Sequence, residues 1–146
     1  MTQQTAGLLI GGVIPAVLLG CFAILQKLSV NLGSTPASLL LFVGVGVTVV
    51  ALTLGAVGGF GPVTLSASVA ALATGVVWAT STALIAVAQG RFGAPVVQLV
   101  PLFNMNTLVA VLLGFIVFAE WRGVRVPRLV IGSVLIVVGG TLVATS

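Results

Sequence analysis

Residues 95–119 read PVVQLVPLFNMNTLVAVLLGFIVFA, an apolar run without a single charged side chain. A helix needs about 20 mainly apolar residues to cross the hydrocarbon core of a bilayer, and this run is long enough. The whole chain has the same character, because 60% of its 146 residues are hydrophobic and 4% are charged. A soluble domain carries about 25% charged residues. Because this small number of charges cannot cover the surface of a water-soluble domain, the sequence predicts an integral membrane protein.

Four further apolar runs accompany this one, separated by short breaks rich in glycine and polar residues. Proline lies at or just before four of the predicted starts, where its missing N–H costs nothing: Pro36, Pro62, Pro95 and Pro127. Backbone polar groups must be paired in lipid, and the runs do not alternate as barrel strands do, so helices are expected. We expect one all-α, polytopic transmembrane domain over residues 1–146, with spans at about 8–27, 37–58, 65–89, 95–119 and 127–145.

The composition excludes several kinds of chemistry. The chain has no His, Asp or Tyr, and Glu120 is its one acidic residue. Paired-carboxylate hydrolysis, a Ser–His–Asp triad and a carboxylate or imidazole metal site therefore lack their parts. Cys21 is the one cysteine, so no internal disulfide can form. We expect no enzyme, no metal and no cofactor. The net charge of +4 indicates contact with membrane surfaces rather than with nucleic acid.

The positive charges specify orientation only weakly. Five spans place the two termini on opposite sides, so Arg122, Arg125 and Arg128 fall on one side and Lys27 and Arg91 on the other. The positive-inside rule then slightly favours a cytoplasmic N-terminus. Two outcomes stay open, a single orientation or insertion in both.

Polar residues follow one face of the third predicted helix. Trp78, Ser81 and Thr82 share this face with Thr74 and Gln89. Ser and Thr can bond to their own backbone, but a mid-span Trp needs a partner for its N–H. We therefore consider Trp78, Ser81 and Thr82 candidate substrate contacts, with hydrogen bonding between helices as the alternative.

The fourth predicted helix carries the strongest polar signal. Pro101 lies inside it and predicts a kink, which makes this residue a candidate hinge. At about 100° per residue, Asn104 and Asn106 point to nearly opposite sides, and Asn106 lies nearer the face of Gln98. Unpaired amides are costly in lipid. Gln98, Asn104 and Asn106 are therefore candidates to line a solute pathway. We expect one face of the helix to line the pathway and the other to hydrogen-bond a neighbouring helix. The alternative is that both asparagines only join helices.

The first predicted helix contains a second candidate hinge, Pro15, and ends at Lys27. Lys27 either extends to the membrane interface or faces a vestibule, where it would attract an anionic or polar solute. We include it among the candidate substrate contacts.

The order of these features resembles one half of an EamA-like drug/metabolite transporter. The similar parts are GVIPA at 12–16 leading to Lys27, QLVPLF at 98–103, GFIVFAE at 114–120, and the closing run from 131 to 140. The sugar-uptake branch, with its glucose- and rhamnose-type permeases, looks closest. The resemblance implies a helix bundle around a central cavity, completed by an inverted second half. Most members have ten spans, so a five-span chain implies an antiparallel homodimer, a second half-size subunit or a fragment.

The resemblance also implies a function. The chain would transport a small solute by alternating access in a prokaryotic inner membrane. Lining by Asn, Gln, Ser, Thr and Trp suits a neutral polar metabolite such as a sugar.

Two other functions are alternatives to this one. A non-transporting assembly subunit would use the Gly-rich helices to pack against another membrane protein. A small-multidrug-type cation exporter needs an acidic residue in its first helix, and residues 8–27 contain none.

Overall fold

The computed structural model describes residues 3–118 and 125–146, and every element within these ranges is helical. Five helical segments among them are long and apolar enough to cross a membrane: Thr5–Asn31, Pro36–Gly58, Leu65–Arg91, Val96–Phe118 and Val126–Ala144. The predicted all-α class is confirmed, and so is the prediction of five helical segments able to span a membrane. The first span continues past Lys27 to Asn31, because Leu28 and Val30 prolong the apolar run. Glu120 and Arg122 lie outside the described residues.

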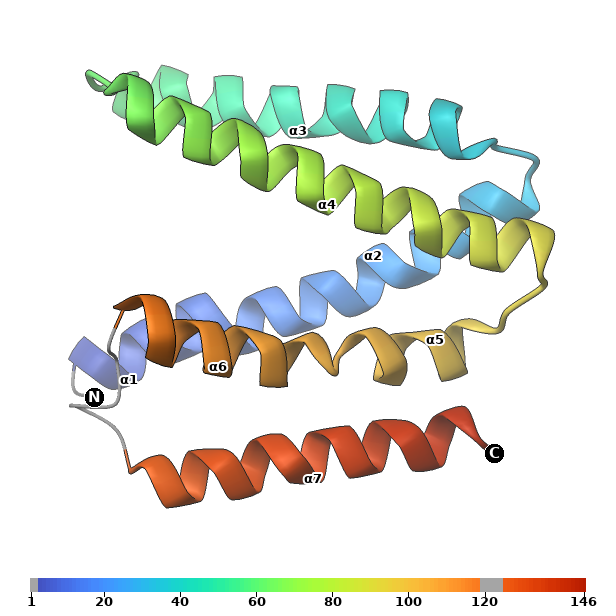
Figure 1. Ribbon diagram of the computed structural model, residues 1–146. Coiled ribbons are helices and arrows are strands. Elements are labelled where there is room, and N and C mark those ends of the chain that lie inside the picture. The colour runs from blue at the N-terminus through green and yellow to red at the C-terminus, as the bar shows by residue number, and fades with distance from the viewer. Residues whose placement is uncertain (1–2, 119–124) are drawn as a thin grey trace. The chain divides into compact units, whose positions relative to one another are not determined.

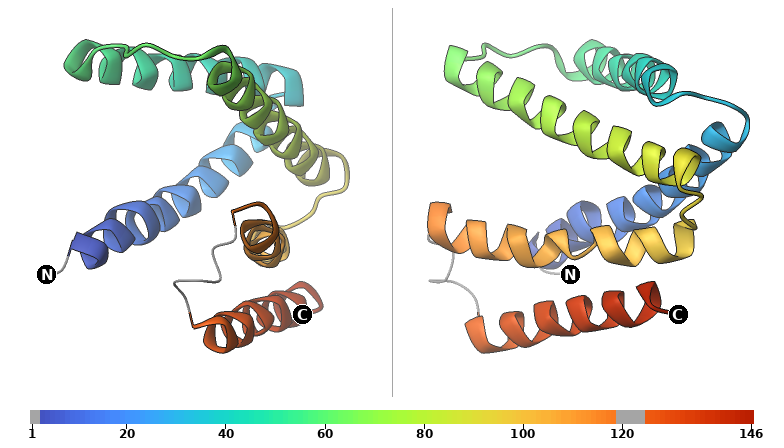
Figure 2. Two further views of the ribbon diagram at one scale, coloured as in Figure 1. Left: turned by 60° about the vertical axis from the view of Figure 1, so that its left-hand side comes forward. Right: turned by 45° about the vertical axis from the view of Figure 1, so that its right-hand side comes forward.

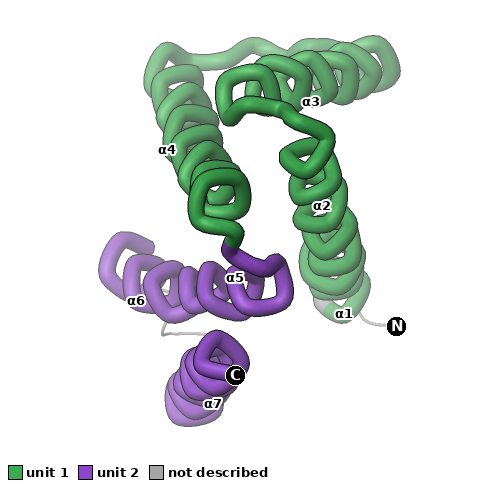
Figure 3. Tube along the Cα trace, turned by 90° about the vertical axis from the view of Figure 1, so that its right-hand side faces the viewer, with its two compact units in different colours: residues 1–93 green, residues 94–146 purple. Residues whose placement is uncertain are grey.

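The chain forms two compact units, residues 1–93 and residues 94–146, coloured separately in Figure 3. Unit 1 contains the first three spans and unit 2 the last two.

The first span of unit 1 contains a π-helical turn. It consists of α1 (Gln3–Leu8), η1 (Leu9–Val13) and α2 (Ile14–Asn31). The amide of Ile14 bonds the carbonyl of Leu9, five residues back. Pro15 follows directly and has no N–H to offer the carbonyl of Gly11. The wider turn therefore lies where proline interrupts the α-helical ladder, as π-turns often do at irregular points of a helix.

Two capped helices complete unit 1. The helix α3 (Pro36–Gly58) begins where Thr35 Oγ1 accepts from the amide of Ser38 at 3.2 Å. The helix α4 (Leu65–Arg91) begins in the same way at Thr64. Each threonine satisfies an amide that the first helical turn leaves without a partner.

Within unit 1, α2 and α4 run in parallel. The contacts between them advance in the same direction along both helices: Phe22 with Trp78, then Gln26 with Thr82, then Lys27 with Gln89. Ala23 and Ala86, 4% and 2% exposed, lie among these residues and allow the two helices to approach closely. By contrast, α2 and α3 diverge from the loop that joins them (Figures 1 and 2).

Unit 2 is built from a broken span and one continuous helix. The broken span comprises α5 (Val96–Phe103) and α6 (Asn106–Phe118), and α7 (Val126–Ala144) lies alongside it (Figure 1). Gly140 of α7 is buried, and a Cβ atom placed on it would lie 2.7 Å from the carbonyl oxygen of Pro101. Only glycine therefore fits this point of contact between α7 and α5.

Candidate functional site

The candidate residues of unit 1 lie along the contact between α2 and α4, which we call the α2–α4 seam. Here Gln26 Nε2 donates to the main-chain oxygen of Thr82 at 3.1 Å. The two residues are 3% and 2% exposed. Such a bond removes the cost of an unpaired amide away from water. Thr82 is therefore placed between two helices, as the helix-joining alternative expects.

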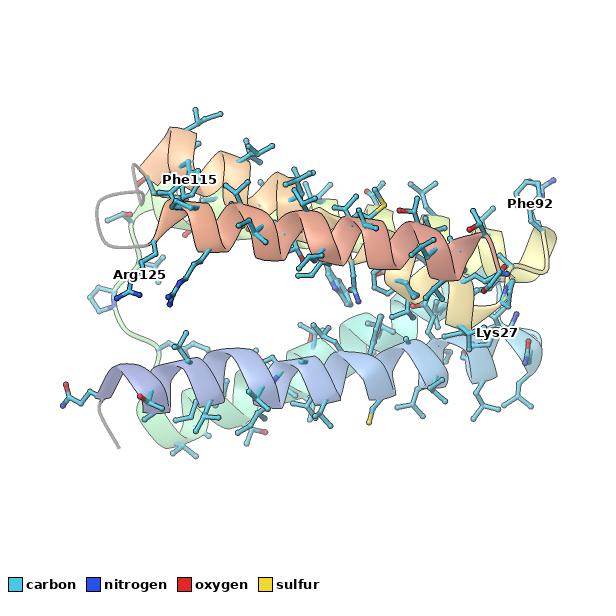
Figure 4. All side chains as sticks on the ribbon, turned by 90° about the horizontal axis from the view of Figure 1, so that it is seen from below. Lys27, Phe92, Phe115 and Arg125 are labelled. Carbon is cyan, nitrogen blue, oxygen red and sulfur yellow. The ribbon has the colours of Figure 1, made fainter. Side chains whose placement is uncertain are left out.

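Lys27 lies at the end of the same seam. Its Nζ atom donates to the main-chain oxygen of Gln89 at 3.3 Å, and Figure 4 shows Lys27 near the end of α2. Gln89 is in the last turn of α4, so the ammonium group meets the negative end of the helix dipole. Gln89 is 4% exposed, and its Oε1 atom has no hydrogen-bond partner among the described residues. Lys27 thus contacts a neighbouring helix rather than projecting freely.

Trp78 keeps one side open. Its ring lies 5.8 Å from that of Phe22, centroid to centroid, yet 39% of the residue is exposed. Ser81, one turn further along α4, is exposed, and its hydroxyl donates to the carbonyl of Val77 at 2.9 Å. Of the three candidates on α4, Trp78 and Ser81 remain accessible from the surface of unit 1.

The candidate residues of unit 2 surround a break in a membrane span. The amide of Met105 bonds the carbonyl of Leu102 at 3.1 Å instead of that of Pro101, its α-helical partner. The amides of Thr107 and Leu108 likewise bond three residues back. The predicted kink therefore appears as a break at Asn104 and Met105, three to four residues beyond Pro101, which has no backbone N–H to donate.

Both asparagines are exposed at this break. No side-chain hydrogen bond of Asn104 or Asn106 to another described residue is present, although the main-chain oxygen of Asn104 accepts from Thr107 Oγ1 at 2.8 Å. The expectation that the two amides point to nearly opposite sides assumed one continuous helix and stays a prediction, because α5 ends at Phe103 and α6 begins at Asn106. Gln98 is half-buried in α5, ahead of the break.

A shallow open hollow follows Asn106 along α6. Its lining is mainly apolar and consists of Asn106, Thr107, Val109, Ala110, Val111 and Leu113. A ligand here would meet one free amide beside an apolar surface, the combination by which proteins orient small polar molecules.

Sequence reasoning did not single out Gln26, which the structure makes the central residue of the α2–α4 seam. A signal was present, because Gln26 is an amide in an otherwise apolar stretch and shares a face with Phe22. It did not reveal the partner, since Thr82 is distant along the chain.

No protein-family model, curated protein or solved structure matches the chain. Function must therefore be inferred from the chemistry of these two groups of residues.

Proposed function

We propose that this chain is one half of a membrane transporter, which works as a dimer by alternating access and carries a neutral polar metabolite such as a sugar. The observation that carries the proposal is the pair of exposed amides, Asn104 and Asn106, at a helix break inside a membrane span.

The position of the break supports this proposal. Asn104 is eight residues beyond the start of the Val96–Phe118 span, or about 12 Å along its axis, which is near mid-membrane. Backbone that leaves the helical pattern at such depth is tolerated where protein covers it or where it lines a water-filled cavity. Interrupted helices at the midplane form substrate sites in many transporters.

The chemistry of the candidate residues favours a neutral solute. An amide side chain both donates and accepts hydrogen bonds, as a sugar hydroxyl does. Gln98, Asn104 and Asn106 supply three such groups in unit 2. The resemblance to the sugar-uptake branch of EamA-like transporters agrees with this solute class and with a prokaryotic inner membrane.

A second copy would complete the site. The Val96–Phe118 span has no buried residue in its most apolar window, so unit 2 by itself leaves Asn104 and Asn106 uncovered. The nearly balanced positive charges permit insertion in both orientations, and an antiparallel copy would supply the inverted second half.

One observation favours the alternative of an assembly subunit. In unit 1, Gln26 and Lys27 both use their polar groups to join α2 to α4. If the amides of unit 2 do the same with another protein, the chain holds a complex together and transports nothing.

Substitution of Asn106 separates these two functions. With purified protein in liposomes, Asn106→Leu should lower the flux of radiolabelled glucose and rhamnose at least about tenfold, the loss expected when one hydrogen bond to a solute becomes an unpaired polar group. The dimer level, measured by cross-linking, should not change. Leu112→Ala, an exposed apolar position on the same helix, is the matched control and should leave both readouts intact. Dispersal of the dimer, with no flux above empty liposomes for any variant, would support the assembly subunit.

A further inference from the structure

The two diverging helices of unit 1 enclose a second binding feature, whose lining includes none of the residues proposed above to contact solute. A groove of about 320 Å³ lies between α2 and α3. Its lining consists of Phe22, Leu25, Gln26, Ser29, Leu39, Phe42 and Val43. Leu25 and Phe42 are 63% and 72% exposed, while Leu39 is 5% exposed, so the groove has open apolar edges and a buried base.

The groove contains a polar group whose hydrogen-bonding capacity is incompletely used. Gln26 is 3% exposed and donates through Nε2 to Thr82, but no described residue donates to its Oε1 atom. Ser29 donates its hydroxyl proton to Ser34 Oγ at 2.9 Å and can still accept a bond. A ligand that offers a proton would therefore find acceptors within an otherwise apolar groove.

The depth of the groove indicates what kind of molecule reaches it. Gln26 is five residues from the end of α2 at Asn31, or about 7.5 Å along the axis. The polar layer of a bilayer is about 5–7 Å thick on each side of the hydrocarbon core. Gln26 thus lies close to the level at which lipid backbones join their chains. From Ser29 to Phe22 the groove continues inward for about 10 Å along α2.

We propose that this groove binds the chain of a monoacylated lipid, whose glycerol hydroxyl donates a hydrogen bond to Gln26 Oε1. The volume is at the lower end of the 300–1,000 Å³ typical of small-molecule sites, so it accommodates part of one chain and not two. A neutral hydroxyl suits the acceptor, because a carboxylate has no proton to donate and a charged ammonium group is costly to remove from water.

Trp78 provides a local reporter of this groove, because its ring lies 5.8 Å from that of Phe22 in the lining. The chain has two tryptophans, so Trp121→Phe leaves Trp78 as the sole source of tryptophan fluorescence. The probe is a monoacylglycerol with a brominated chain, which quenches nearby indole rings, in phosphatidylcholine nanodiscs. The comparison probe is the same lipid with both hydroxyls methylated.

We expect the hydroxylated probe to reach half-maximal quenching at a mole fraction about two- to tenfold lower than the methylated probe, the range for one hydrogen bond. Gln26→Met should remove this preference. Val43→Phe, which fills the groove and leaves the hydrogen bonds of Gln26 and Ser29 in place, should weaken quenching by the hydroxylated probe to the level of its methylated form. Val45→Phe is the matched control on the opposite face of α3, and should change neither curve.

Equal quenching of the unsubstituted chain by both probes would overturn the proposal. So would strong, selective quenching that survives Val43→Phe. If Gln26→Met loses its helical circular-dichroism signal, Val43→Phe still decides the outcome. None of these results depends on solute transport, so the lipid site and the proposed function can fail separately.

Discussion

The side-chain amide of Gln26 donates a hydrogen bond of 3.1 Å to the main-chain oxygen of Thr82, and both residues are almost completely buried. The bond joins two parallel membrane spans at a defined register. It lies between the ring contact of Phe22 with Trp78 and the bond from Lys27 to Gln89. The α2–α4 seam is thus a line of specific contacts rather than a purely apolar interface.

Gln26→Leu should weaken this seam. The substitution removes the donor but keeps a side chain of similar size, so we expect a loss of about 0.5–1.5 kcal/mol in unfolding free energy. Denaturation by sodium dodecyl sulfate in mixed micelles, followed by circular dichroism, measures it. Ile24→Val, at an exposed position on the same helix, should have little effect. Unchanged stability in Gln26→Leu would mean that the bond contributes nothing to the seam.

Lys27→Met should also lower stability, because the ammonium group bonds a carbonyl at the C-terminal end of α4. Charge at a helix terminus contributes about 0.3–1 kcal/mol, and we expect a loss of that size. Lys27→Arg keeps the positive charge and should recover most of it. If Lys27→Met instead abolished solute flux with no change in unfolding free energy, the side chain would be a solute contact and not a contact between helices.

Gly140→Ala should separate α7 from α5. The new Cβ atom would lie 2.7 Å from the carbonyl oxygen of Pro101, and a backbone atom cannot move away as a flexible side chain can. Overpacking of this kind costs about 1–3 kcal/mol.

The adjacent glycine provides the control for that measurement. A Cβ atom on Gly139 meets nothing within 4 Å, so Gly139→Ala should be neutral or stabilising by up to about 1 kcal/mol through its better helix propensity. Equal unfolding free energies for the two variants would contradict the close contact between Gly140 and Pro101.

The spans could be predicted because they depend on local composition. Hydropathy locates them and prolines mark their starts, so the observed starts of α3, α5 and α7 lie within one residue of the predicted ones, at 36, 96 and 126 against 37, 95 and 127. Pro101 likewise predicted an interruption, because a missing amide hydrogen is a local property.

Relations between helices could not be predicted from the same information. Gln26 and Thr82 are 56 positions apart, and no periodicity within either helix says which faces will meet. The expected directions of Asn104 and Asn106 rested on one continuous helix, whose periodicity could not locate the break between α5 and α6. The sequence suggested the candidate residues. It could not predict that Lys27 and Thr82 would be bonded in the α2–α4 seam while Asn104 and Asn106 would be exposed at the break.

Membrane orientation tests most directly the central claim that an oppositely inserted copy of this five-span chain completes the transporter. A reporter active only in the cytoplasm and one active only in the periplasm are fused separately after Ser146, and the two signals are compared at equal expression. Lys27 and Arg91 nearly balance the arginines near the start of α7, so we predict substantial signal from both reporters. Signal from one reporter alone would contradict the antiparallel homodimer.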